Sequence, residues 1–141
     1  MSENKEPKIV GFLCKWCTSA AADLAGTSRT QYPASIRPIK VMCSGSVDMS
    51  YILRALLMGA DGVLVGGCHP ADCHYISGNY KARRRIAILK NIFETLGLDS
   101  ERIELKWISA SEGTKFARTV EAFTNKLAEK GPNDFEKLWN I

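Results

Sequence analysis

Several signatures are missing from this 141-residue sequence, and each absence narrows the classes of protein to which it can belong. No apolar run approaches the roughly 18–20 residues needed to cross a bilayer. The first residues, MSENKEP, are polar and lack the apolar stretch of a secretory signal. We therefore expect a cytoplasmic protein without a membrane partner. The net charge of +4 is too mild to predict a nucleic-acid partner unless it is concentrated on one face.

Common catalytic and nucleotide-binding motifs are missing as well. No G-x-G-x-x-G and no G-x-x-x-x-G-K-[ST] occurs, so sites for dinucleotides and nucleotide phosphates lack support. A G-x-S-x-G serine is also absent, and no pair of carboxylates is evident around a substrate pocket. These absences predict a protein with no catalytic residues and no substrate site of its own.

A regular alternation of short apolar runs and amphipathic stretches is what the sequence does contain. The apolar runs predict strands at Ile9 to Leu13, Ile39 to Met42, Gly62 to Val65 and Ile103 to Ile108. The second and third runs are nearly continuous, which is typical of strands buried on both faces, whereas the fourth alternates and predicts one wetter face. Helices are predicted over 18–24, 47–58, 79–96 and 112–130.

Capping residues and the overall order of elements complete the prediction of the fold. Ser46 is the expected N-cap of the helix over 47–58, and Ser109 with Glu112 forms a capping box for the last helix. The alternation predicts an α/β fold, a single three-layer domain with a mainly parallel four-stranded sheet flanked by helices, flavodoxin-like or Rossmann-like. We expect a flexible N-terminus over 1–7, the domain over 8–131 and a C-terminal docking tail over 132–141.

Five cysteines fall beside the ends of the predicted strands. Cys14, Cys43 and Cys68 follow three successive strands, and Cys17 and Cys73 lie three and five residues beyond two of them. Since the carboxyl ends of parallel strands meet at one edge of a sheet, where open α/β folds bind ligands, these thiols should converge.

Several chemistries would use such a group of thiols. Isolated cysteines are often buried hydrophobes, and a dithiol redox protein would need only Cys14 and Cys17. A metal site explains more of the cysteines, and four thiolates can hold zinc in a structural adaptor or an iron–sulfur cluster. We expect Cys14, Cys43, Cys68 and Cys73 to be the ligands, with Cys17 as a possible alternative. His69 and His74 could be ligands but are expected to form hydrogen bonds beside the site.

Four stretches carry a resemblance to a known family: FLCKWCTSAAADLAG, VMCSGSVD, DGVLVGGCHPADCHYISGNYKARRR and WISASEGTKFA. Together they resemble the iron–sulfur delta subunit of methyl-viologen-reducing (non-deazaflavin-reducing) nickel–iron hydrogenase, a partner of heterodisulfide reductase. The resemblance implies one 2Fe–2S cluster. It also implies electron transfer from the nickel–iron hydrogenase small subunit to the flavin-bearing heterodisulfide reductase subunit, in the flavin-based electron bifurcation of methanogenesis. All five cysteines fall on motif positions of the family, so the resemblance does not identify the spare one.

Two segments are candidate surfaces for protein partners. A basic run opens the helix over 79–96, and its residues Arg83, Arg84 and Arg85 are expected to dock an acidic partner or an anionic cofactor that the partner holds. The tail places Phe135, Leu138 and Trp139 close together, an apolar density that is unusual for a free terminus. We expect these side chains to contact the flavin-bearing subunit.

Overall fold

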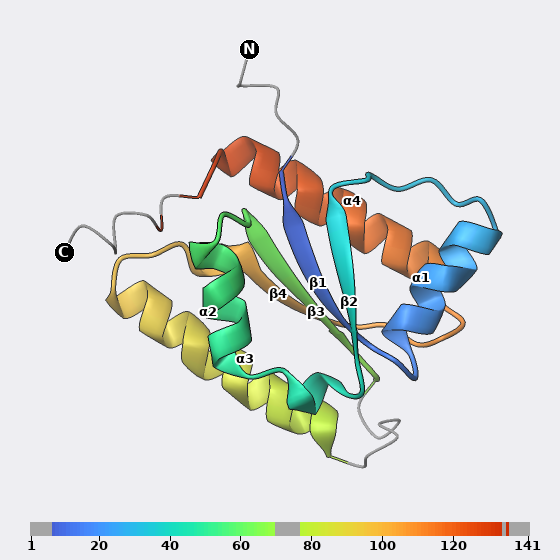
Figure 1. The fold of residues 1–141 in the computed structure, drawn as a ribbon, viewed down its shortest axis with the longest axis horizontal. Coiled ribbons are helices and arrows are strands. Elements are labelled where there is room, and N and C mark those ends of the chain that lie inside the picture. The colour runs from blue at the N-terminus through green and yellow to red at the C-terminus, as the bar shows by residue number, and fades with distance from the viewer. Residues whose placement is uncertain (1–6, 70–76, 134, 136–141) are drawn as a thin grey trace.

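A computed structural model describes residues 7–69, 77–133 and 135 of the chain (Figure 1). Along these residues, strands and helices alternate in the order β1 (Ile9–Cys14), α1 (Thr18–Thr27), β2 (Ile36–Val41), α2 (Met49–Leu57), β3 (Gly62–Gly67), α3 (Gly78–Thr95), β4 (Ile103–Trp107) and α4 (Gly113–Lys130). Two short 3-10 helices, η2 (Ser44–Ser46) and η3 (Ser100–Arg102), precede α2 and β4. In the part of the chain described here, no helix is both long and apolar enough to cross a membrane.

The four strands form one sheet in the order β2-β1-β3-β4, and every neighbouring pair is parallel. Helices α1 and α4 cover one face of the sheet, and α2 and α3 cover the other (Figure 1). The predicted three-layer α/β fold is therefore confirmed, with a sheet that is wholly parallel.

This strand order places a topological switch point between β1 and β3. The chain leaves β1 through α1 to reach β2 on one side, and it leaves β3 through α3 to reach β4 on the other. Loops after these two neighbouring strands consequently diverge to opposite faces of the sheet. In open α/β sheets, ligands bind in the crevice outside the carboxyl ends of such strands.

The core lies in two layers, because successive side chains of each strand point to opposite faces. On β1, Ile9 and Leu13 pack among residues of α1 and α4, whereas Phe12 packs among residues of α2 and α3. Every residue of the central strand β3 is buried, as its continuous apolar run predicts.

Strand β2 departs from the prediction, because it lies at the edge of the sheet and is mostly exposed. Of its six residues only Ile36 is buried, and the side chain of Ile39 is 46% exposed. An apolar run gives no information on strand order, and a strand with one neighbour is covered less by the flanking helices. The interpretation of this run as a strand buried on both faces was wrong.

The predicted C-terminal ends of the helices agree with the structure better than the predicted N-caps do. Gly59, Gly97 and Gly131 have positive φ angles of 110°, 77° and 79°, the left-handed conformation that ends helices. The prediction of Ser46 as N-cap was wrong, because Ser44–Ser46 forms η2 and Asp48 caps α2 by accepting a hydrogen bond from the Ser50 N–H at 3.1 Å.

The described part of the C-terminal segment packs on the domain. The Asn133 side chain donates hydrogen bonds to the carbonyl oxygens of Leu56 and Ala60, and Arg102 donates to that of Gly131 at 3.0 Å. Phe135 is fully buried, with its ring centroid 5.2 Å from that of Phe93. These contacts correct the expectation that Phe135 is offered to a partner. Leu138 and Trp139 lie outside the described residues.

Candidate metal centre

Three of the cysteine thiols converge at the switch point of the sheet. Cys14 ends β1, Cys68 directly follows β3, and Cys17 directly precedes α1. Their Sγ atoms all lie within 4.8 Å of one another, with 3.9 Å between Cys14 and Cys68 and 3.0 Å between Cys17 and Cys68. All three side chains are buried, so the fold gathers three soft ligands in a protected position.

The five predicted cysteines differ in where the structure places them. Cys14 and Cys68 come together, as their positions after β1 and β3 predict. Cys17, expected as the alternative ligand, joins them because its N–H donates to the Cys14 carbonyl at 3.3 Å and closes a tight turn. Cys43 is buried at the start of η2, outside this group of three, and its Sγ accepts a hydrogen bond from the Gly45 N–H at 3.4 Å. Cys73 and His74 lie outside the described residues.

Hydrogen bonds among the thiols shift the pKa values of Cys14 and Cys17 in opposite directions. The Cys17 side chain bonded to Cys14 lowers the pKa of Cys14 to about 6, against the opposing effect of burial. The same contact and burial raise the pKa of Cys17 well above its ordinary value. Cys14 therefore loses its proton more readily than Cys17, and the thiolate is the form of cysteine that binds metals.

Two glycines at the end of β3 allow the loops to approach so closely. A Cβ atom on Gly66 would lie 2.4 Å from Cγ2 of Thr18, and one on Gly67 would lie 2.7 Å from Oγ of Ser44. The Thr18 hydroxyl in turn donates to the Ile108 carbonyl at 3.2 Å, which fixes the start of α1 against the end of β4. The missing side chain of Gly66 thus lets Thr18, and with it Cys17, approach the end of β3, whereas that of Gly67 makes room for Ser44.

A buried amide holds the turn that carries Cys68. Asn79, in the first turn of α3, has no exposed surface, and its Nδ2 donates to the carbonyl oxygens of Cys68 at 3.0 Å and of His69 at 2.9 Å. Asn79 was not among the residues predicted from the sequence. The signal that could have found it is a polar side chain on the buried face of α3, one position from the helix start.

His69 forms a hydrogen bond beside the site, as predicted. Its Nε2 lies 2.5 Å from Oε1 of Glu112, which also accepts from the Ser109 N–H at 2.9 Å. The backbone hydrogen bond from Ser109, followed by that from His69, lowers the pKa of Glu112 to about 2. Of the predicted capping box, the hydrogen bond from the Ser109 N–H to the Glu112 carboxylate is present. The Ser109 hydroxyl instead lies 3.3 Å from that of Ser111.

The basic run on α3 divides into exposed and anchored residues. Arg83 and Arg84 are exposed. Arg85 is half-buried, and its guanidinium donates to the carbonyl oxygens of Gly45 and Val47, which ties α3 to η2. Arg85 therefore has a structural contact that its place in a charge run does not predict.

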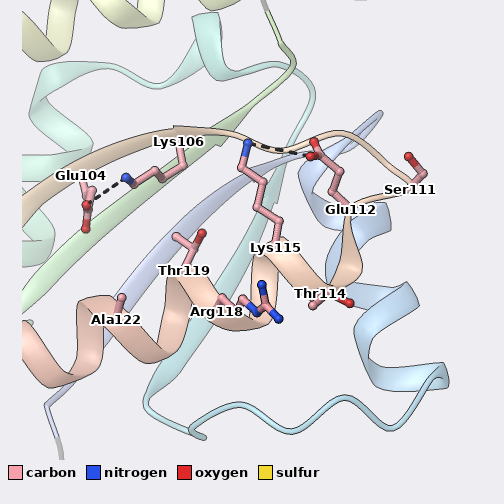
Figure 2. Close-up of a pocket in the computed structure, with 9 residues that line it drawn as sticks. All are labelled: Glu104, Lys106, Ser111, Glu112, Thr114, Lys115, Arg118, Thr119 and Ala122. Atoms are coloured by element: carbon pink, nitrogen blue, oxygen red, sulfur yellow. Dashed lines mark ion pairs between the residues drawn. The ribbon is translucent and has the colours of Figure 1, made fainter.

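A polar groove of about 490 Å³ lies between β4 and α4 (Figure 2). Its carboxylates are paired, Glu104 with Lys106 at 3.5 Å and Glu112 with Lys115 at 3.9 Å. Arg118 also lines the groove, and none of the cysteines that the structure describes does. Glu112, which lines the groove, contacts His69 beside the thiol site.

Replacing Asn79 with alanine is expected to destabilise the turn after β3. The change leaves the Cys68 and His69 carbonyls without their donor, and each unsatisfied buried group costs about 1–3 kcal/mol. Urea denaturation should therefore show a lower free energy of unfolding, whereas Asn91→Ala, on the same helix but exposed, should change it by less than about 0.5 kcal/mol. Equal stabilities of the two variants would contradict this role of Asn79.

The fold and the site define a small α/β domain with a wholly parallel sheet. Three converging thiols at its switch point are suited to bind a soft metal. Residues 9–131 match the family described as methyl-viologen-reducing hydrogenase, delta subunit, and the chain belongs to this family. The resemblance noted in the sequence is thereby confirmed.

Relatives of known name agree with this family. The chain is 54% identical over 132 residues to the iron-sulfur subunit of the vhc F420-non-reducing hydrogenase of Methanococcus voltae, covering 94% of this chain and 92% of that protein. It is 50% identical over 137 residues to the iron-sulfur subunit of the F420-non-reducing hydrogenase of Archaeoglobus profundus, covering 97% and 100%.

A third relative is a much longer protein. The chain is 51% identical over 126 residues to one subunit of the ferredoxin/F420H2-dependent CoB-CoM heterodisulfide reductase of Methanosarcina acetivorans. The matched part is 89% of this chain but only 16% of that protein, which we call the long reductase subunit. The same domain therefore occurs both as a separate chain and as a part of a larger one.

Proposed function

We propose that the chain is an electron-transfer subunit that carries one 2Fe–2S cluster at the cysteine edge of its sheet. The observation that carries the proposal is the convergence of the Cys14, Cys17 and Cys68 thiols within 4.8 Å at the switch point. Relatives at 50–54% identity are named iron-sulfur subunits, which supports the same function.

The residues present fit such a group. Two thiolates bound to one metal ion at about 2.3 Å are roughly 3.8 Å apart in tetrahedral geometry, close to the 3.9 Å between Cys14 and Cys68. The site is buried and contains sulfur ligands, the donors that iron–sulfur clusters use in proteins. A single zinc ion would accept the same three thiols, and the iron and sulfide content of the purified protein distinguishes the two metals.

The geometry favours Cys14, Cys17 and Cys68 as ligands, with the fourth supplied by Cys43 or Cys73. The set expected from the sequence consists of Cys14, Cys43, Cys68 and Cys73. It differs from the set that the geometry favours because it leaves out Cys17. The Gly45 N–H bound to the Cys43 sulfur is a contact that would also stabilise a thiolate ligand.

In this proposal, the bound cluster accepts and donates single electrons. The residues around it limit the access of water and hold the cysteine ligands in position. The buried thiols exclude water, and Asn79 holds the backbone of Cys68. Trp16, between two of the thiols in sequence, is 43% exposed, which supports a site close to the surface. Electrons pass between proteins across short gaps, so an edge location suits a relay.

The proposed partners are the nickel–iron hydrogenase small subunit as electron donor and the flavin-bearing heterodisulfide reductase subunit as acceptor. The resemblance noted in the sequence implies these two subunits, and the family and the names of the relatives support a hydrogenase and a heterodisulfide reductase as partners in general. The chain would then serve flavin-based electron bifurcation in methanogenesis in the cytoplasm, as a non-catalytic subunit of an oxidoreductase. Exposed Arg83 and Arg84 remain proposed contacts for an acidic partner.

Electron paramagnetic resonance of the anaerobically purified chain tests this function. Reduction with dithionite is expected to give the signal of a one-electron-reduced 2Fe–2S cluster, with a visible absorption that bleaches and returns on reoxidation. A colourless, signal-free protein that contains zinc would instead make the chain a structural adaptor. Metal-free protein whose Cys14 and Cys17 cycle between dithiol and disulfide would make it a dithiol redox protein.

A further inference from the structure

Helix α2 is unusually apolar for a helix at the surface of a domain. Among its nine residues, MSYILRALL, Arg54 is the only charged one. The side chains of Tyr51 and Met58, seven positions apart and hence on one side, are 51% and 78% exposed. Exposed apolar side chains that gather on one side of a surface often mark a contact with another protein.

The exposed apolar surface continues from α2 onto the edge strand β2. Phe12 of β1 is paired in register with Ile39 of β2, and its ring centroid is 6.3 Å from that of Tyr51. Ile39 is 46% exposed, and Met42, just beyond the strand, is 53% exposed. We call the surface formed by Ile39, Tyr51 and Met58 the α2–β2 face.

This face begins at the thiol site. The Met42 carbonyl oxygen lies 3.9 Å from Sγ of Cys14. The Lys15 N–H donates to the Val41 carbonyl at 2.7 Å, so the turn that carries Cys14 and Cys17 lies against the end of β2. A protein bound to the α2–β2 face would therefore lie beside the thiols.

The charges that border the face are mainly positive. Lys15, Arg37 and Arg54 are exposed on the turn, on β2 and on α2. The nearby carboxylate, Asp48, accepts the capping hydrogen bond of α2. A complementary surface would be apolar at its centre and carry carboxylates around its rim.

We propose that the α2–β2 face is a permanent docking site for a partner of the long reductase subunit type, through an apolar, carboxylate-rimmed surface of that protein. Permanent interfaces are more apolar than transient ones, which fits the composition of α2. In one relative, this domain makes up 16% of a heterodisulfide reductase chain, so the domain can be covalently joined to such a protein. The inference rests on the proposed function for the choice of partner.

Binding measurements between this chain and the separately purified heterodisulfide reductase partner of the same organism test the proposal. Tyr51→Glu and Ile39→Glu, each at an exposed position, are expected to raise the dissociation constant at least about tenfold. The double variant Arg37→Glu with Arg54→Glu should weaken binding most at low salt, because screening reduces the effect of charges at high salt.

Ile88→Glu on α3 is the matched control, because Ile88 is 51% exposed, the same fraction as Tyr51. It should leave binding unchanged. Wild-type affinity in Tyr51→Glu and Ile39→Glu, or an equal loss in Ile88→Glu, would overturn the proposed face. Binding of wild type to the hydrogenase but not to the reductase partner, lost in Tyr51→Glu, would overturn the proposed partner.

Iron content, measured on the same samples, separates this proposal from the function on which it rests. Iron-free wild-type protein that still binds the reductase partner through Tyr51 would contradict the cluster but support the docking face. Iron-loaded protein whose affinity for the reductase partner is unchanged by all these substitutions would support the cluster and overturn the docking face.

Discussion

Replacing Cys68 with alanine is expected to remove the bound iron almost completely. The Cys68 sulfur lies close to both of the other converging sulfurs, 3.9 Å from that of Cys14 and 3.0 Å from that of Cys17. Its loss leaves only three of the four proposed cysteine ligands, too few to hold the cluster. Iron per chain after anaerobic purification, measured beside circular dichroism to verify the fold, gives the result. A folded Cys68→Ala protein with wild-type iron would contradict the site.

Cys17→Ala is the variant that decides between the two ligand sets. If the three thiols that converge in the structure bind iron, this variant should also lose it. If the set expected from the sequence is correct, Cys17→Ala should keep its iron and Cys73→Ala should lose it. Cys43→Ala and Cys73→Ala, compared with each other, identify the remaining ligand.

Phe135→Ala is expected to destabilise the domain by about 3–5 kcal/mol, the usual loss when a buried phenylalanine is truncated. Phe135 has no exposed surface and packs edge-on against Phe93. The measurement is urea denaturation of the full chain. A fall in stability would show that this residue belongs to the core.

Leu96→Ala is a suitable control for this prediction, because Leu96 follows α3 and is 59% exposed. It should change stability by less than about 0.5 kcal/mol. If Phe135→Ala is as stable as this control and instead loses affinity for a partner, Phe135 is a docking residue, as the sequence had suggested.

Local pattern was sufficient to predict the elements of the fold and two of the three converging thiols. The alternation of apolar runs and amphipathic stretches is set by burial in three layers, and it predicted every strand and helix to within a few residues. Cys14 and Cys68 could be placed together because parallel strands end at one edge of the sheet. That inference needed only the positions of two strand ends.

Features that depend on distant parts of the chain could not be predicted in this way. The exposure of β2 follows from strand order, which no local pattern determines. Phe135 is buried because the Asn133 side chain reaches carbonyl groups of residues more than 70 positions earlier. Arg85 is anchored by carbonyls of η2. Cys17 joins the site through a turn and through the missing side chain of Gly66.

Iron and acid-labile sulfide per chain, determined on anaerobically purified wild-type protein, is the most direct test of the proposed cluster. We expect about two iron atoms and two sulfide ions per chain, the composition of a 2Fe–2S cluster. One zinc ion and no sulfide would contradict the proposal, because the converging thiols would then hold a structural metal and the chain could not relay electrons.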